Sequence, residues 1–142
     1  MGGMADNIQE LRPKAAESEK ITINLGFVDL GHVDLLVQDG FYANRTDFIR
    51  TAIRNQLDRH NDVLKRSVAR QQLDLGLRRY GKRELEAARD AGETLHIQVL
   101  GLAVIDMDVS AQLAREAIAS LRVLGALQAS AEVKAALRDR QL

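Results

Sequence analysis

The chain has 142 residues, of which 46% are hydrophobic and 28% charged, with a formal net charge of zero and no cysteine. This length fits one ordinary domain, or a small module with a second small unit, and it excludes two large independent cores. Disulfides, thiolate nucleophiles and cysteine-based zinc sites are excluded, and no apolar run reaches the roughly 18 residues that a membrane-spanning helix needs. Because the N-terminal segment also lacks the apolar core of a signal peptide, we expect a soluble, cytoplasmic protein.

The zero net charge conceals an uneven distribution along the chain. Residues 1–44 carry 3 basic and 7 acidic residues, residues 45–83 carry 11 and 4, and residues 84–142 carry 6 and 9. A positive middle segment favours contact with phosphates, whose neutralisation supplies most of the non-specific affinity for DNA. A solvated helix rich in Arg and Lys gives the same count, so charge alone does not separate a DNA-binding segment from an ordinary surface.

The first predicted elements are an arm and a strand. Residues 1–19 are polar, contain the only proline and show no sustained period, which is typical of a mobile arm. From Lys20 the sequence KITINLG alternates apolar and polar residues, which predicts a strand with one apolar face. Such a strand needs a partner strand and a core. The apolar positions are Ile21, Ile23 and Leu25, and the polar positions are Lys20, Thr22 and Asn24.

Two helices are predicted next. Apolar residues recur at helical spacing after Gly26 until Asp39 and Gly40 end the run, which predicts a short first helix. Asn44 is a typical N-cap with Asp47 as its capping partner, and it begins a second helix whose pattern extends as far as Val68. The apolar stripe of this second helix consists of Phe48, Ile49, Ala52, Ile53 and Leu57.

The remaining half of the chain contains a repeat. Gly76, Gly101 and Gly125 stand 25 and 24 residues apart, each in a short apolar run that is followed by a turn and a helical segment. Ser110 and Ser130 are candidate N-caps for two of these helices. The alternation predicts β-α units with neighbouring parallel strands, because a helical crossover returns the chain in the same direction. The edges of such a small sheet are expected to be covered or paired with another subunit.

The segment from Lys20 to the second helix resembles the ribbon-helix-helix family of bacterial DNA-binding proteins. The resemblance is carried by KITINLG, by the break at Asp39 and Gly40, and by NRTDFIRTAIRNQL, and it covers about a third of the chain. One departure is Gly26, which stands where many members have proline. The resemblance implies a dimeric ribbon-helix-helix domain over residues 20–66, after the arm of residues 1–19. The repeat separately predicts a β-α oligomerisation domain over residues 67–142, and the two parts together give an α+β fold.

In that family two chains pair their strands into an antiparallel ribbon that enters the DNA major groove. Carried over to this sequence, the resemblance implies that Lys20, Thr22 and Asn24 read bases. Lys can donate to guanine acceptors, Asn can bond adenine through two hydrogen bonds, and Thr can bond a base or touch a thymine methyl. The alternative is an exposed strand with ordinary polar residues.

The start of the second helix is predicted to hold a DNA phosphate. Free backbone N–H groups and the helix dipole favour an anion near Asn44, Arg45 and Thr46. Such a contact sets the register of the protein on DNA and carries no sequence information. The plainer reading is that Asn44 only caps the helix, and that Arg45 or Arg50 pairs with an acid such as Asp47.

Signals for catalysis or metal binding are weak. His32, His60 and His96 lie far apart without the spacing of a metal site, and Asp106 and Asp108 are more typical of turn and cap positions. No phosphate-binding loop or nucleophile elbow is present. We therefore expect no enzyme, no cofactor and no metal.

The sequence leaves three functions open. The leading one is a sequence-specific transcriptional regulator, a repressor, whose partners are double-stranded DNA, a second copy through the ribbon, and further copies through the C-terminal region. The second is the antitoxin of a toxin–antitoxin pair, against which the folded pattern of the C-terminal half argues. The third is a structural scaffold whose repeats polymerise. A small-molecule sensor in the C-terminal half has no sequence signature.

Overall fold

The computed structural model describes residues 18–142 of the chain, so the predicted N-terminal arm lies almost wholly outside the described residues. The described residues divide into two compact units, residues 18–67 and residues 68–142. Helices and strands are mixed along the chain, as the predicted α+β class requires. In the part of the chain that the structure describes, no helix is both long enough and apolar enough to cross a membrane.

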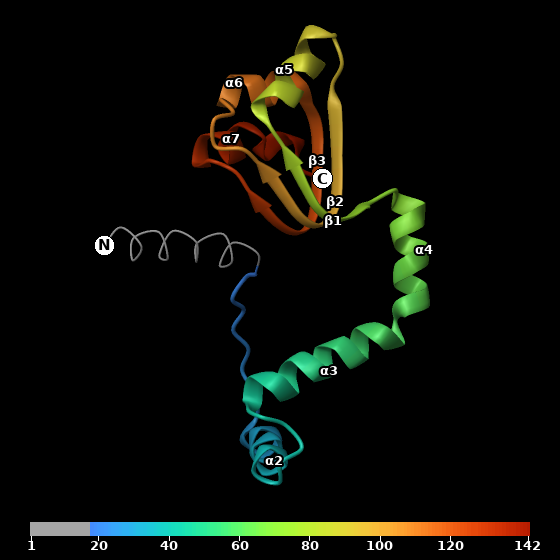
Figure 1. Ribbon diagram of the computed structural model, residues 1–142, viewed down its shortest axis with the longest axis vertical. Coiled ribbons are helices and arrows are strands. Elements are labelled where there is room, and N and C mark those ends of the chain that lie inside the picture. The colour runs from blue at the N-terminus through green and yellow to red at the C-terminus, as the bar shows by residue number, and fades with distance from the viewer. Residues whose placement is uncertain (1–17) are drawn as a thin grey trace, which may run out of the picture. The chain divides into compact units, whose positions relative to one another are not determined.

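The segment expected to form a strand is irregular in the single chain. Residues 18–26 carry no strand hydrogen bonds and run as an extended segment into the first described helix (Figure 1). A strand whose partner is the same strand of a second chain forms no ladder within one chain, because backbone pairing needs a neighbour. The intermolecular ribbon therefore stays a prediction.

The first predicted helix is α2, Phe27–Gln38. It ends in a Schellman motif, in which Phe41 N donates to Leu36 O at 3.0 Å and Gly40 N donates to Val37 O at 3.1 Å. Gly40 has φ +86°, a conformation that glycine adopts without a steric cost. The stop signal at Asp39 and Gly40 is thus confirmed.

The second predicted helix is divided into two. Helix α3, Arg45–Arg59, ends at His60, and α4, Asn61–Gln71, begins directly after it (Figure 1). The expectation of one helix running to Val68 was therefore wrong at His60. Between Leu57 and Val63 the sequence offers no apolar side chain to hold a continuous helix against a core, and Asn61 and Asp62 are weak helix formers.

Residues 18–67 bury very little. Val33 on α2 is the buried side chain of this unit, while α3 and the part of α4 within it have none. The rings of Tyr42 and Phe48 meet edge to face with centroids 5.0 Å apart. Large apolar side chains remain exposed along the extended segment and both helices, including Ile21, Ile23, Phe27, Leu35, Phe41, Ile53 and Leu57. One copy of this unit has no closed core, so it presents surface that an association would bury.

Residues 68–142 form a parallel sheet covered by helices on one face. Strands β1, Asp74–Tyr80, β2, Leu95–Ile105, and β3, Ile118–Gln128, lie in the order β1-β2-β3. They alternate with α5, Lys82–Asp90, α6, Ala111–Ala117, and α7, Ala131–Ala136, followed by a 3-10 turn at Arg138–Arg140 (Figure 1). As predicted, the hydroxyls of Ser110 and Ser130 cap α6 and α7 by accepting from Leu113 N at 3.1 Å and from Val133 N at 3.2 Å.

The core of this unit lies between the sheet and its three helices. Leu85 on α5, Val133 on α7 and three small or apolar residues of α6 pack against alternate residues of the strands. Each fully buried Leu, Ile or Val contributes about 1.5–3 kcal/mol through burial of apolar surface. The buried strand residues of this core are Tyr80, Ile97, Val99, Ala103, Ile105, Ile118 and Leu121.

Three glycines stand side by side across the sheet and form a glycine ladder. Gly76 pairs with Gly101, and Gly101 pairs with Gly125. Their φ angles are +110°, +137° and +119°, in the region that side chains rarely adopt. A Cβ on Gly101 would lie 2.2 Å from Gly76 O, and one on Gly125 would lie 2.1 Å from Gly101 O. The spacing of 25 and 24 residues in the sequence is therefore the length of chain between neighbouring rungs of one sheet.

Candidate nucleic-acid interface

The three predicted base-reading residues lie in the extended segment before α2. Lys20, Thr22 and Asn24 are all exposed. The apolar residues between them are also exposed, with 72% of Ile21 and 56% of Ile23 accessible to solvent. Both sides of the alternating pattern are therefore accessible in one chain, and burying the apolar side requires a second surface.

The predicted phosphate site lies at the start of α3. The Oδ1 atom of Asn44 accepts a hydrogen bond from Asp47 N at 2.8 Å, while Oδ2 of Asp47 accepts from Ala43 N at 2.9 Å. This reciprocal capping confirms both predicted roles, except that Asp47 bonds the residue before the cap. The capping function of Asn44 is thus established whether or not a phosphate binds.

Arg45 has a partner that the sequence did not indicate. Its Nε and Nη2 atoms donate to Oδ1 and Oδ2 of Asp34 on α2, both at 2.8 Å, in a two-pronged ion pair. The hydrogen bonds from Arg45 hold the pKa of Asp34 below its usual range of about 4. The pair is therefore formed at neutral pH and lost as the pH falls through that lowered pKa. Asp47, the acid that the sequence offered as an alternative partner, is used in the cap instead.

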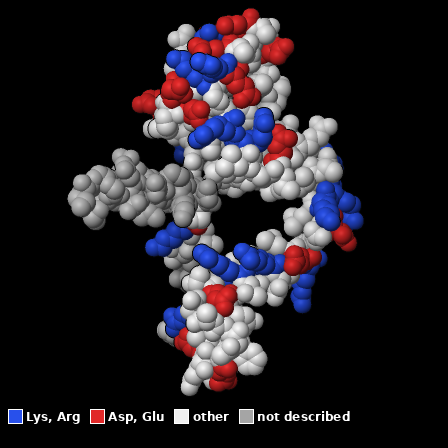
Figure 2. All heavy atoms as spheres, in the orientation of Figure 1, with Lys and Arg blue, Asp and Glu red and all other residues white. Residues whose placement is uncertain are grey.

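Basic side chains gather along α3 and α4. Figure 2 shows Lys and Arg side chains over both helices, and every one of them is exposed. Asp47, Asp58 and Asp62 interrupt the series, so the positive charge is a property of the whole stretch and not of one continuous patch. The basic residues are Arg45, Arg50, Arg54, Arg59, Lys65, Arg66 and Arg70.

The remaining polar candidates make structural contacts. His96 Nδ1 lies 2.8 Å from Ser120 Oγ on the neighbouring strand, and His60 Nε2 lies 3.4 Å from Gln56 Nε2. Among residues 18–142, no group of three or more acidic or histidine side chains is arranged to hold a metal ion. The expectation of no metal site is not contradicted by this part of the chain.

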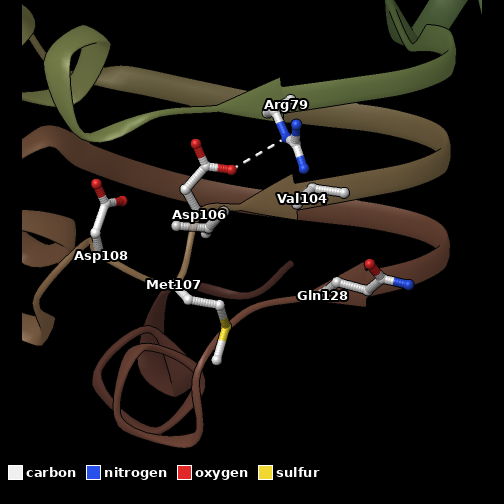
Figure 3. Close-up of a pocket in the computed structure, with 7 residues that line it drawn as sticks. Arg79, Val104, Asp106, Met107, Asp108 and Gln128 are labelled. Atoms are coloured by element: carbon white, nitrogen blue, oxygen red, sulfur yellow. Dashed lines mark ion pairs between the residues drawn. The ribbon is translucent and has the colours of Figure 1, made fainter. Parts of the chain in front are cut away.

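Asp106 and Asp108 lie beside an open hollow of about 430 Å³ at the ends of the strands. Figure 3 shows Asp106 directed at Arg79, and the two side chains form an ion pair of 3.1 Å, while Met107 and Gln128 line the other side. Asp106 also forms a turn through its backbone, because Val109 N donates to Asp106 O at 3.1 Å. The turn role predicted for this residue is therefore confirmed.

Comparison with known proteins gives one family. The ribbon-helix-helix transcriptional regulator family matches residues 16–134. Neither a curated protein nor a solved structure matches the chain. The family match extends well past the N-terminal segment on which the resemblance rested, as far as α7, so most of the β-α unit lies within it. The chain belongs to the ribbon-helix-helix transcriptional regulator family.

Proposed function

We propose that the protein is a sequence-specific transcriptional repressor, which inserts an antiparallel ribbon formed by residues 20–25 of two chains into the DNA major groove. Membership in the family implies DNA binding, dimerisation and a non-enzymatic role. The ribbon is supported by the exposure of Ile21 and Ile23. They belong to residues 18–67, where Val33 is the one side chain that the described structure buries.

Pairing two copies of this segment would bury its exposed apolar side chains. Ile21, Ile23 and Leu25 alternate with polar residues, so they would share one face of a ribbon and lie against the helices of both chains. Burial of each isoleucine would contribute about 1.5–3 kcal/mol, and a twofold dimer counts each contribution twice. The same pairing would turn Lys20, Thr22 and Asn24 to the opposite face, where they would meet base edges.

The start of α3 would fix the ribbon on the DNA backbone. Within the described chain, the backbone N–H groups of Arg45 and Thr46 are in the first turn of α3, where a helix has no internal acceptor for them. A phosphate placed there would also meet the guanidinium of Arg45, which it would share with Asp34. Asn44 would keep its cap and orient this turn.

The C-terminal sheet offers a means of further association. Its order leaves β1 and β3 as edge strands, with Gln141 making one bridge to Leu121 on β3. Free strand edges tend to pair with another chain. We propose that these edges join dimers into a higher oligomer, which would place several ribbons on adjacent half-sites.

The same free edges also favour a second candidate, a structural scaffold that grows through the sheet. Light scattering over a range of protein concentrations would separate the two, because a closed oligomer reaches a constant mass whereas an open array keeps growing. The antitoxin candidate has no comparable support, since residues 74–142 are largely folded into strands and helices.

The ribbon is tested by replacing Lys20, Thr22 and Asn24 with alanine together. We expect specific binding to an operator selected from random DNA to fall at least about 100-fold, because each good base contact discriminates by about 1–3 kcal/mol. The dimer should persist, since the replaced side chains lie on the polar face. Fluorescence anisotropy across salt concentrations and light scattering measure the two properties.

The matched control is Lys134→Ala, which removes the same single positive charge from the exposed face of α7. It should leave operator affinity within about twofold of the parent. Unchanged operator binding in the triple variant would overturn the ribbon assignment.

A further inference from the structure

The face of the sheet that the helices do not cover is apolar at its centre. Alternate strand residues point into the core, so the residues between them lie on the other face, here called the open face. The strand register places Leu75, Leu100 and Leu124 in one row across this face. Leu77, Leu102 and Ala126 form the next row.

Polar rows border this apolar centre. Arg79, Val104 and Gln128 form the row on one side, and Gln98 and Arg122 lie in register on the other. An apolar centre with a polar rim is the usual anatomy of a protein interface. Leu75 is 73% and Leu77 60% exposed on β1, and Leu124 is 46% exposed on β3, so a single chain leaves both ends of the apolar rows in contact with water. Parallel sheets are commonly covered on both faces, which makes this exposure unusual.

The size of the open face limits what can cover it. Strands lie about 4.8 Å apart and rise about 3.3 Å per residue, so three strands with seven paired residues span roughly 300–350 Å². Two such faces would bury well below the roughly 1,200 Å² at the lower end of independent, specific interfaces. The open face therefore cannot hold a free partner strongly. It suits a partner that is already held nearby.

We infer that the open face packs against the same face of the second chain in the ribbon dimer. This inference rests on the dimer of the proposed function. Joining two chains through residues 18–67 makes the meeting of their C-terminal units intramolecular, which raises their mutual effective concentration and lets a smaller apolar interface suffice. The ribbon dimer therefore holds the two open faces close together, as their small contact area requires.

Twofold pairing of the open face is compatible with its charges. A rotation axis along the strands would set β1 over β3 of the second copy, which brings Leu75 against Leu124 and Arg79 against Gln128. No arginine of this face then lies opposite another arginine. The central strand β2 would lie over the partner's β2, so Leu102 would be close to its own copy.

The absence of cysteine from the chain makes a direct test simple. Leu102→Cys introduces one thiol near the proposed axis, and a short bis-maleimide joins two thiols across packed sheets, which lie about 10 Å apart and beyond the reach of a disulfide. We expect most of the protein to become a covalent dimer, with a yield that does not change on dilution as long as light scattering shows a mass of at least two chains. Gln112→Cys, at an exposed position of α6 on the helix-covered side, should give little product.

Two further substitutions distinguish specific packing of the two open faces from random collision of the two thiols. Leu75→Gln with Leu77→Gln, added to Leu102→Cys, should abolish the covalent dimer while circular dichroism and operator binding stay unchanged, because both leucines are exposed in the single chain. Equal products at positions 102 and 112, a yield that falls with dilution, or a product that survives the Gln substitutions would each overturn the inference. A monomeric mass would instead show that the ribbon dimer itself is wrong.

Discussion

Replacing Gly101 with alanine is expected to destabilise the C-terminal unit by about 2–6 kcal/mol. Two costs combine at this position. The backbone has φ +137°, where a side chain is strained by about 1–3 kcal/mol. The new Cβ would also lie 2.2 Å from Gly76 O, so the backbones of β1 and β2 must separate. Hydrogen exchange of peptides from β1 and β2 in a urea series measures the loss in the unit concerned.

Two other glycines give matched controls. Gly76→Ala carries the strain of φ +110° but has nothing within 4 Å of the new Cβ, so it should cost only about 1–3 kcal/mol. Gly31→Ala lies in α2 with open space around it, and should be neutral or stabilising by up to about 1 kcal/mol. Equal costs for Gly101→Ala and Gly76→Ala would show that the close approach of Gly101 to the backbone of Gly76 adds nothing to the cost of a side chain.

Replacing Ile23 with asparagine is expected to weaken the dimer by about 100- to 20,000-fold. The proposed ribbon buries Ile23 of both chains, and each loses about 1.5–3 kcal/mol of burial energy, which together correspond to that range. Because residues 18–67 have no closed core in one chain, we also expect helices α2 and α3 to become less protected from hydrogen exchange. Sedimentation over a dilution series measures the dissociation constant.

The neighbouring substitution Thr22→Asn supplies the contrast. It places the same side chain one residue away, on the polar face of the alternating segment, so the dimer should persist while the operator preference changes. Opposite outcomes at adjacent positions are the signature of a strand with one buried face. A dimer that is equally sensitive at both positions, or at neither, would contradict the alternation on which the ribbon rests.

Local signals in the sequence predicted much of the fold. The stop at Asp39 and Gly40, the cap at Asn44 and the caps at Ser110 and Ser130 all depend on residues a few positions apart, and each is present. The regular spacing of the three glycines was visible in the sequence. Their role in letting the strands approach closely was not visible, because Gly101 meets the backbone of Gly76 only after the strands are in register.

Features set by distant or missing partners were harder to predict. The ion pair between Asp34 and Arg45 joins two helices across a turn, and nothing in the sequence distinguishes Asp34 from other exposed acids. The break at His60 reflects a lack of apolar contacts over the middle of a polar run, which the pattern of the flanking turns concealed. The hydrogen bonds of a ribbon join two chains, so they arise only when a second copy is present.

Chemical interference mapping with dimethyl sulfate tests the central claim most directly, on an operator selected from random DNA. This reagent methylates guanine N7 in the major groove and adenine N3 in the minor groove. If Lys20, Thr22 and Asn24 read bases from a ribbon in the major groove, guanine methylation should block binding at discrete positions, and the triple alanine variant should lose those positions. Interference confined to adenine N3, or an identical pattern in the triple variant, would contradict the account.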